Sequence, residues 1–271
     1  MKQINRNNNH TIVKLKDSNI KVLIPDGYIR LKKKNPLEEI QTKIKNESVA
    51  FQKIVEISNN YIFVDKIKPQ QLIKYSKEET IKAIRNLLKD NQGIIEVEYG
   101  YTKRGYRYIY TLVKELNNEI RGCNYHLMIQ LVNEEAKEFD AVLITGDFNE
   151  INMTGTRESL CLDLARRAGL IDFSKENIFE DWSEDPYDPE YKEGVLMNLS
   201  ERAGLDSLFP FHPLTQCREV LKAVINDELV IIKKEDNDAK KDEGFNENEK
   251  EFLLKLFNNE VDRITYDVEI K

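Results

Sequence analysis

The sequence predicts an α+β fold, in which a twisted antiparallel sheet is flanked by helices and followed by an acidic, partly helical and partly irregular C-terminal extension. Two observations support this fold class. Four strand-like segments follow one another between residues 93 and 148, and the links between them are too short for helical crossovers, which favours antiparallel neighbours. Amphipathic helix patterns lie before and after these strands.

Two hairpins are predicted ahead of this region. Residues 10–15 and 20–25 flank turn residues, and the turn "PDGY" follows them. Residues 48–57 and 61–67 form the second pair, separated by the letters "SNN". All four segments are rich in β-branched residues and aromatic or apolar side chains, as strands are.

Residues 77–91 have the strongest helix pattern. Ser76 is a suitable N-cap, and Glu79 three residues later completes a capping box. A stripe of isoleucines and leucines supplies one buried face. Gly93 is predicted to end the helix in a left-handed turn.

The four consecutive strands are expected at 93–100, 106–115, 120–132 and 140–148. Because side chains alternate along a strand, the third strand should place two different sets of residues on its two faces. One face carries Cys123, Tyr125, Leu127 and Ile129, and the other carries Asn124, His126, Met128 and Gln130.

The remaining elements define four predicted regions: a sheet domain over 1–170, an acidic loop and helix extension packed on it over 171–233, a flexible charged linker over 234–249, and an amphipathic helix and tail over 250–271. A helix is expected at 155–168, with Leu160, Leu164 and Ala168 on one stripe. A second helix at 213–226 and a last strand at 228–234 complete the extension.

Composition favours a cytoplasmic protein. The N-terminus has no apolar stretch typical of a secretory signal, and no run of residues has the length and hydropathy of a membrane span. Cys123, Cys161 and Cys217 are widely spaced, which suits reduced, buried thiols. The net charge of −7 disfavours nucleic acid as a partner, because phosphate contacts need concentrated lysine and arginine.

One short motif suggests catalysis. "GDFN" at 146–149, with "NYHL" at 124–127 and "FHPL" at 211–214, resembles the endonuclease/exonuclease/phosphatase superfamily of metal-dependent phosphodiesterases. The resemblance implies active-site roles for four residues, namely Asp147, Asn149, His126 and His212. The family's metal-binding glutamate has no counterpart, and Phe211 stands where the family has an aspartate. The alternative is that "GDFN" turns the chain at a strand end.

Residues 176–201 combine eight carboxylates up to Glu193 with the only tryptophan, Trp182. A calcium loop is excluded by spacing, because a frame that starts at Asp181 has Pro186 at the glycine position and Lys192 at the glutamate position. Aromatic side chains among polar groups are typical of protein interfaces. The candidate partner-binding residues are Phe179, Trp182, Asp185, Tyr187, Asp188 and Tyr191. The alternative is that these aromatics cap the protein's own core.

The stretch "IKVLIPDGYIRL", followed by this element order, resembles the PsbP-like fold over residues 10–170. That fold is shared by photosystem accessory proteins, a Ran-binding nuclear-import factor and bacterial proteins, and its members are typically non-enzymatic. The incomplete catalytic set and the rigid, aromatic acidic segment 176–201 together predict a cytoplasmic, non-enzymatic interaction or adaptor module whose protein partner contacts this segment. We therefore expect no catalytic residue, no metal ligand and no cofactor, and we keep the metal-dependent phosphodiesterase as the alternative function.

Overall fold

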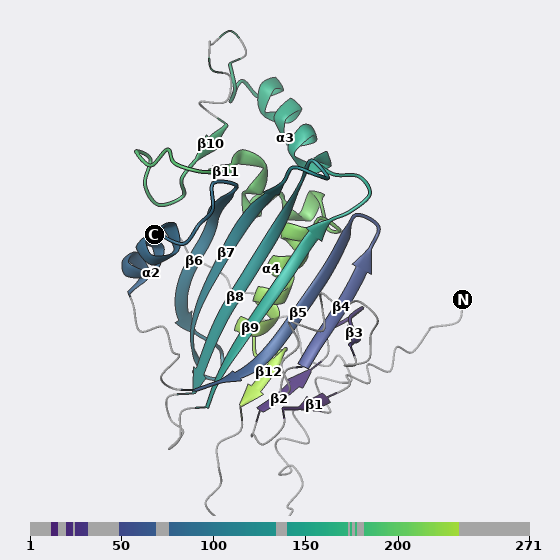
Figure 1. The fold of residues 1–271 in the computed structure, drawn as a ribbon. Coiled ribbons are helices and arrows are strands. Elements are labelled where there is room, and N and C mark those ends of the chain that lie inside the picture. Colours follow the sequence, from purple (N-terminus) through teal and green to yellow (C-terminus); the bar gives the residue numbers. More distant parts are fainter. Residues whose placement is uncertain are drawn as a thin grey trace, which may run out of the picture. The chain divides into compact units, whose positions relative to one another are not determined.

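The computed structural model describes residues 12–15, 20–23, 25–31, 49–68, 76–133, 140–172, 174, 177 and 182–232. The predicted linker 234–249, the predicted C-terminal helix 250–271 and Phe179 lie outside these residues. Within them, the expected α+β architecture is confirmed: a large antiparallel sheet is accompanied by a few helices (Figure 1).

The main sheet has seven strands in the order β3-β4-β5-β9-β8-β7-β6, and every neighbouring pair is antiparallel. In that spatial order the strands are β3 Ile29–Arg30, β4 Val49–Val55, β5 Ser58–Ile67, β9 Asp140–Glu150, β8 Gly122–Asn133, β7 Arg107–Asn117 and β6 Gln92–Tyr101. The run from β6 to β9 is the meander that the short links predicted.

The remaining elements are two small sheets and several helices. The sheets are formed by β1 Ile12–Lys14, β2 Ile20–Leu23 and β12 Val230–Ile232, and by β10 Ser183–Glu184 and β11 Met197–Asn198. The helices are α2 Lys77–Arg85, α3 Thr156–Arg167 and α4 Pro213–Ile225, with 3-10 turns η2 Leu199–Glu201 and η3 Ala203–Leu208. The described helices are all too short or too polar to cross a membrane.

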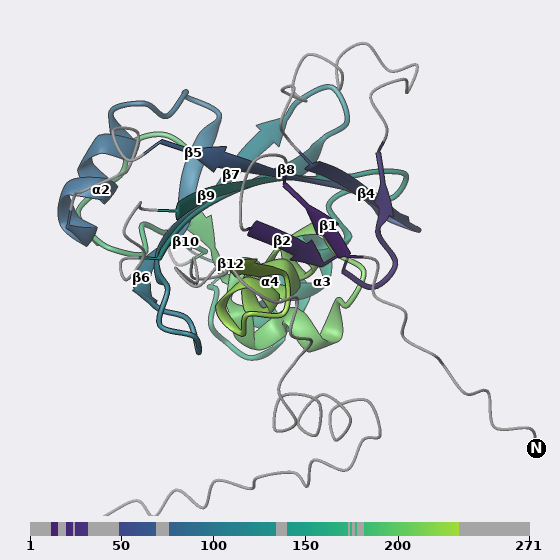
Figure 2. The same ribbon diagram turned by 90° about the horizontal axis from the view of Figure 1, so that it is seen from below.

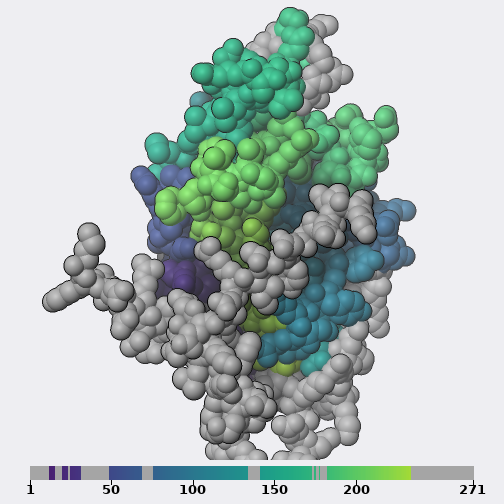
Figure 3. Space-filling model, turned by 180° about the vertical axis from the view of Figure 1, so that it is seen from behind, coloured from purple at the N-terminus to yellow at the C-terminus, as the bar shows by residue number. Residues whose placement is uncertain are grey.

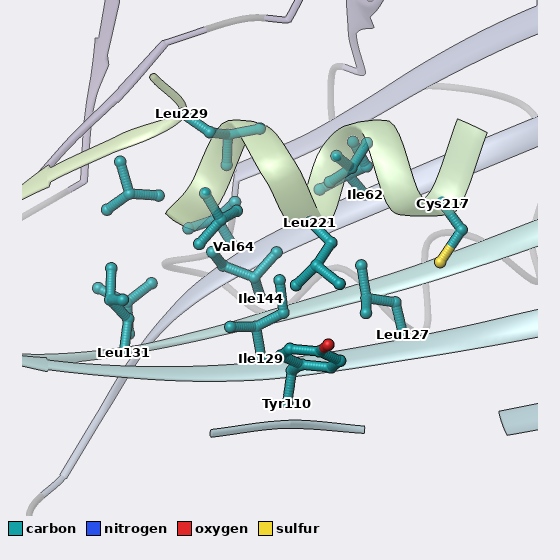
Figure 4. Packing of buried hydrophobic residues seen from close by; sticks show 14 of the residues in the cluster. Ile62, Val64, Tyr110, Leu127, Ile129, Leu131, Ile144, Cys217, Leu221 and Leu229 are labelled. Carbon is teal, nitrogen blue, oxygen red and sulfur yellow. The ribbon is translucent and has the colours of Figure 1, made fainter. Parts of the chain in front are cut away.

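One face of the main sheet holds the hydrophobic core. Figure 2 shows α4 and the small β1-β2-β12 sheet on the same side of the main sheet. Leu221 of α4 points toward Ile129 and Ile144 of the sheet (Figure 4), and all three are buried. Seen from behind, α4 and the 3-10 turns cover this face, with α3 above them (Figure 3). The opposite face is crossed at its middle by none of the described helices (Figure 1).

Several local predictions are confirmed. Ser76 caps α2 together with Glu79, in the expected capping box. All three cysteines are free and buried. In β8, the face with Cys123 and Tyr125 belongs to the core, as alternation predicted.

Other local predictions are wrong. Helix α2 ends at Arg85 with Asn86 as C-cap, and Gly93 lies inside β6. The second hairpin turns at Glu56 and Ile57, so "SNN" belongs to β5. Apolar spacing alone missed the end of α2, because Gly93 pairs with Lys114 of β7 instead of ending the helix.

Helix α3 also packs differently from the prediction. Leu160 and Leu164 are exposed, whereas Arg157, Cys161 and Ala165 form the buried face. The prediction placed an apolar stripe on the buried face of α3, and the structure has a charged arginine on that face. It is tolerated because its guanidinium is hydrogen-bonded throughout, as described below.

Candidate functional site

Trp182 packs inside the molecule. Its side chain is 8% exposed and lies in a cluster with Cys161, Ala165 and Ile171. The backbone carbonyl of Trp182 accepts a hydrogen bond from the amide of Leu199 at 3.0 Å. Trp182 therefore follows the alternative in which the aromatics cap the protein's own core, and its indole is not an exposed anchor for a partner.

Asp185 organises the turn that follows. Its carboxylate is buried and accepts backbone hydrogen bonds from Tyr187 at 2.9 Å and Asp188 at 3.0 Å. The same oxygen accepts from Nη2 of Arg85 at 2.7 Å. This charge-assisted bond ties the segment to helix α2. Asp185 is therefore a positioning residue within the fold.

The Tyr187 side chain makes hydrogen bonds at the edge of β6 that a neighbouring strand would otherwise make. Its hydroxyl accepts from the amide of Val97 at 2.6 Å and donates to the carbonyl of Val97 at 3.0 Å. Farther along the same edge, the amide of Val195 donates to the carbonyl of Gln92 at 3.3 Å. Residues 185–195 therefore cover part of an edge that would otherwise expose unpaired backbone groups.

A groove of about 450 Å³ remains between α2 and this segment. It is lined by Glu78, Ile81, Lys82, Arg85, Asn86, Tyr187, Asp188, Tyr191 and Glu193. The Arg85 guanidinium lies 4.2 Å from the centre of the Tyr191 ring, and the Lys77 ammonium lies 5.0 Å from the centre of the Tyr187 ring. Of the candidate partner-binding residues, Tyr187, Asp188 and Tyr191 line the groove, and each is partly exposed.

The phosphodiesterase candidates divide between the two faces of the sheet. His126 and Asp147 are register partners on β8 and β9, and Nδ1 of His126 lies 2.9 Å from Oδ1 of Asp147. Oε2 of Glu115 lies 3.3 Å from Nε2 of the same imidazole. Asn149 lies on this face as well and donates to the carbonyl of Asn59 at 3.2 Å. All of these residues belong to the face that α4 does not cover.

His212 is on the opposite face. It is the N-cap of α4, is 1% exposed, and its Nε2 lies 3.2 Å from Oε1 of Glu150. Glu150 shares its side of β9 with the core residue Phe148, and Asp147 points the other way. The four residues named by the resemblance therefore do not converge. The turn alternative is wrong too, because residues 146–149 run inside β9.

Sequence reasoning missed a buried ionic network between α3, α4 and the 3-10 turns. Arg157 is fully buried and donates to Ser200 O, Thr215 Oγ1 and Asp206 Oδ1. Lys114 of β7 is 2% exposed, and its ammonium lies 2.7 Å from Oε2 of the buried Glu201. The only sequence signal was the spacing of Arg157 with Cys161 and Ala165 on one helical stripe.

No family model matches the chain, and no curated protein matches it in sequence. Among solved structures, the Ran-binding protein Mog1p of Saccharomyces cerevisiae is similar with 14% identity and a TM-score of 0.34, over 57% of this chain and 83% of that one. A mutant of Mog1 gives the same identity and TM-score over 57% and 84% of the two chains. A likeness this low carries no argument about fold or function, so the PsbP-like resemblance stays a prediction.

Proposed function

We propose that the protein is a non-enzymatic, cytoplasmic module that binds another protein, and that the groove between α2 and residues 185–193 receives a basic side chain of the partner. One observation carries the proposal: the groove combines two partly exposed tyrosine rings with three carboxylates. Aromatic faces beside carboxylates suit an ammonium or guanidinium group. The cytoplasmic location rests on the three free, buried cysteines.

The charges of the groove support a cationic ligand. Glu78, Asp188 and Glu193 contribute three carboxylates, against two cationic lining residues. One of these, Arg85, is already paired with the buried Asp185 at 2.7 Å, and its Nη1 also lies 3.9 Å from Oδ2 of Asp188. Lys82 is thus the remaining cation of the lining, and the local balance is acidic.

Two cations of the chain already lie over the tyrosine rings, which supports a cationic ligand. The Arg85 guanidinium over Tyr191 and the Lys77 ammonium over Tyr187 are cation–π contacts within the chain. Such contacts contribute roughly 0.5–1 kcal/mol at exposed sites. A partner's lysine or arginine has to add to these contacts or displace them, so we expect moderate affinity.

The proposal is tested with fluorescently labelled peptides that carry one lysine or arginine between apolar residues, each paired with a glutamate counterpart. Fluorescence anisotropy should show binding of basic peptides in preference to their counterparts. Tyr191→Ala should weaken it about tenfold, equivalent to about 1.4 kcal/mol. Glu193→Gln should weaken it in the same direction. Tyr101→Ala is the matched control, because this tyrosine is 63% exposed and outside the groove.

Two outcomes would count against the groove. One is equal binding of basic and acidic peptides by the wild-type protein. The other is equal loss of affinity in Tyr191→Ala and Tyr101→Ala, which would show that neither tyrosine belongs to a specific site.

A metal-dependent phosphodiesterase is the second candidate, supported by the 2.9 Å contact between His126 and Asp147 on the face whose middle none of the described helices crosses. It would have to work without His212. The test is hydrolysis of bis(p-nitrophenyl) phosphate with Mg²⁺ or Mn²⁺. Activity that Asp147→Asn abolishes and the partly exposed Asp163→Asn leaves unchanged would establish the enzyme in place of the non-enzymatic module.

A further inference from the structure

Three metal-ligating side chains meet beneath the sheet, outside the groove and outside the His126–Asp147 pair. They are Glu150 at the end of β9, Glu158 in the first turn of α3, and His212 at the N-cap of α4. One ligand atom from each lies within 4.8 Å of the other two. The sequence suggested no metal site here, because the three residues belong to separate segments.

Glu150 is fully partnered. One oxygen accepts from the amide of Cys123 at 2.7 Å, and the other lies 3.3 Å from the amide of Gly155 and 3.2 Å from Nε2 of His212. The ring of His212 is held by Tyr125, whose ring packs edge-on at 5.8 Å between centroids. The carboxylate of Glu150 and the ring of His212 are thus held in place before any ion binds.

Glu158 differs from Glu150. Both of its carboxylate oxygens are buried, and neither has a hydrogen-bond partner in another residue that the structure describes. A second buried carboxylate beside the first is costly unless a positive charge or a proton lies between them.

We propose that Glu150, Glu158 and His212 bind one divalent transition-metal ion, Zn²⁺ or Mn²⁺. The donor set is one imidazole nitrogen and carboxylate oxygens without a thiolate, which suits these ions. Zinc ligands lie about 2.0–2.2 Å from the ion, and so roughly 3.3 Å from one another. The His212–Glu150 separation of 3.2 Å already fits this spacing. The carboxylate of Glu158, whose ligand atom lies within 4.8 Å of the other two, has to move inward.

Metal binding changes the hydrogen bonds of His212. The amide of Leu214 donates to Nδ1 at 3.3 Å, so the neutral ring carries its proton on Nε2 and directs it at Glu150. An ion held by Nε2 requires the ring proton to lie on Nδ1 instead. The Leu214 amide then loses its acceptor, and the metal bond at Nε2 has to outweigh that loss.

The site would act as a structural clamp. It joins the end of β9 to the starts of α3 and α4, and it adds to the hydrogen bonds of Gly155 and His212 with Glu150. A bound ion stabilises the folded state in proportion to its occupancy. The clamp lies away from the groove residues, so it goes beyond the proposed peptide binding and does not depend on it.

The test uses the full chain after treatment with a chelator. Calorimetric titration with ZnCl₂ and with MnCl₂ should give one ion per chain, and the ion should raise the melting temperature. Glu158→Gln keeps the shape of the side chain and removes its charge. We expect it to fold, to bind peptides normally, and to lose at least tenfold in metal affinity. Glu119→Gln, at an exposed glutamate, is the matched control.

A second measurement identifies the histidine ligand. Co²⁺ substituted for Zn²⁺ should give a visible absorption spectrum that His212→Gln changes. The proposal is overturned if the wild-type protein shows no saturable binding of either ion, or if Glu158→Gln binds as tightly as the wild type. It is also overturned if metal binds but His212→Gln leaves the cobalt spectrum unchanged, because the bound ion then lies elsewhere.

Discussion

Gly93→Ala tests whether residues 185–195 are held against the edge of β6. A Cβ atom at Gly93 would lie 1.6 Å from the carbonyl oxygen of Val195. Real Cβ contacts essentially never fall under 3.0 Å, so the segment has to retreat by about 1.4 Å. Backbone conformation is no obstacle to alanine, because the φ of Gly93 is not in the left-handed region.

The cost follows from the contacts that this retreat breaks. The Val195–Gln92 hydrogen bond at 3.3 Å is lost, and the two bonds between Tyr187 and Val97 are strained or lost. A typical intramolecular hydrogen bond contributes roughly 0.5–1.5 kcal/mol, so we expect a loss of about 2–3 kcal/mol in the free energy of unfolding. Alanine's smaller loss of backbone entropy offsets less than about 1 kcal/mol of this.

Urea unfolding measures the stability, and hydrogen exchange of the Val97 amide reports locally on the contact. Gly204→Ala is the matched control, because nothing lies within 4 Å of a Cβ placed there. The reasoning is refuted if Gly93→Ala and Gly204→Ala have equal stability and the Val97 amide exchanges at its wild-type rate in both.

Two further predictions concern buried charges. Lys114→Met leaves the buried Glu201 without its ammonium partner and should cost about 3–5 kcal/mol, and adding Glu201→Gln should restore part of it in urea unfolding. Burial raises the pKa of Asp227 above 3.8, against the opposing charges of Lys103 and Arg104, so the folded chain holds this proton more tightly than the unfolded chain. The contribution of protonated Asp227 to the free energy of unfolding is present at low pH and is lost as pH rises through the folded pKa. Asp227→Asn should therefore gain stability relative to wild type from about pH 4 upward, as urea unfolding at several pH values would show, whereas an unchanged difference would contradict the assignment.

The sequence predicted the sheet well because the alternation of residues along each strand indicates which of its faces is buried. Period-two alternation in β8 follows directly from one face that packs on the core and one whose middle none of the described helices crosses, and Cys123 and Tyr125 lie where alternation placed them. The cap at Ser76 was predictable for the same reason, since its partner Glu79 is three residues away. Such a pattern can be predicted without a structure, because the residues that cause it lie close together in the sequence.

The site was less predictable because its contacts join distant segments. Asp185 meets Arg85 across 100 positions of sequence, and Tyr187 meets Val97 across 90. No periodicity marks which loop aromatic turns inward, so Trp182 and Tyr191 could not be distinguished. The separation of His212 from Asp147 depends on which face of the sheet α4 covers, and its own amphipathic pattern does not determine that.

Residues 185–195 combine two roles that their composition alone left open. Asp185 and the Tyr187 hydroxyl are used inside the chain, where they hold the segment on α2 and β6. That attachment gives the segment a fixed position, and the remaining surfaces of Tyr187, Asp188 and Tyr191 become one wall of the groove. Binding at the groove should therefore depend on the intramolecular contacts. Gly93→Ala, which touches no groove residue, should weaken peptide binding along with stability, because it displaces the wall.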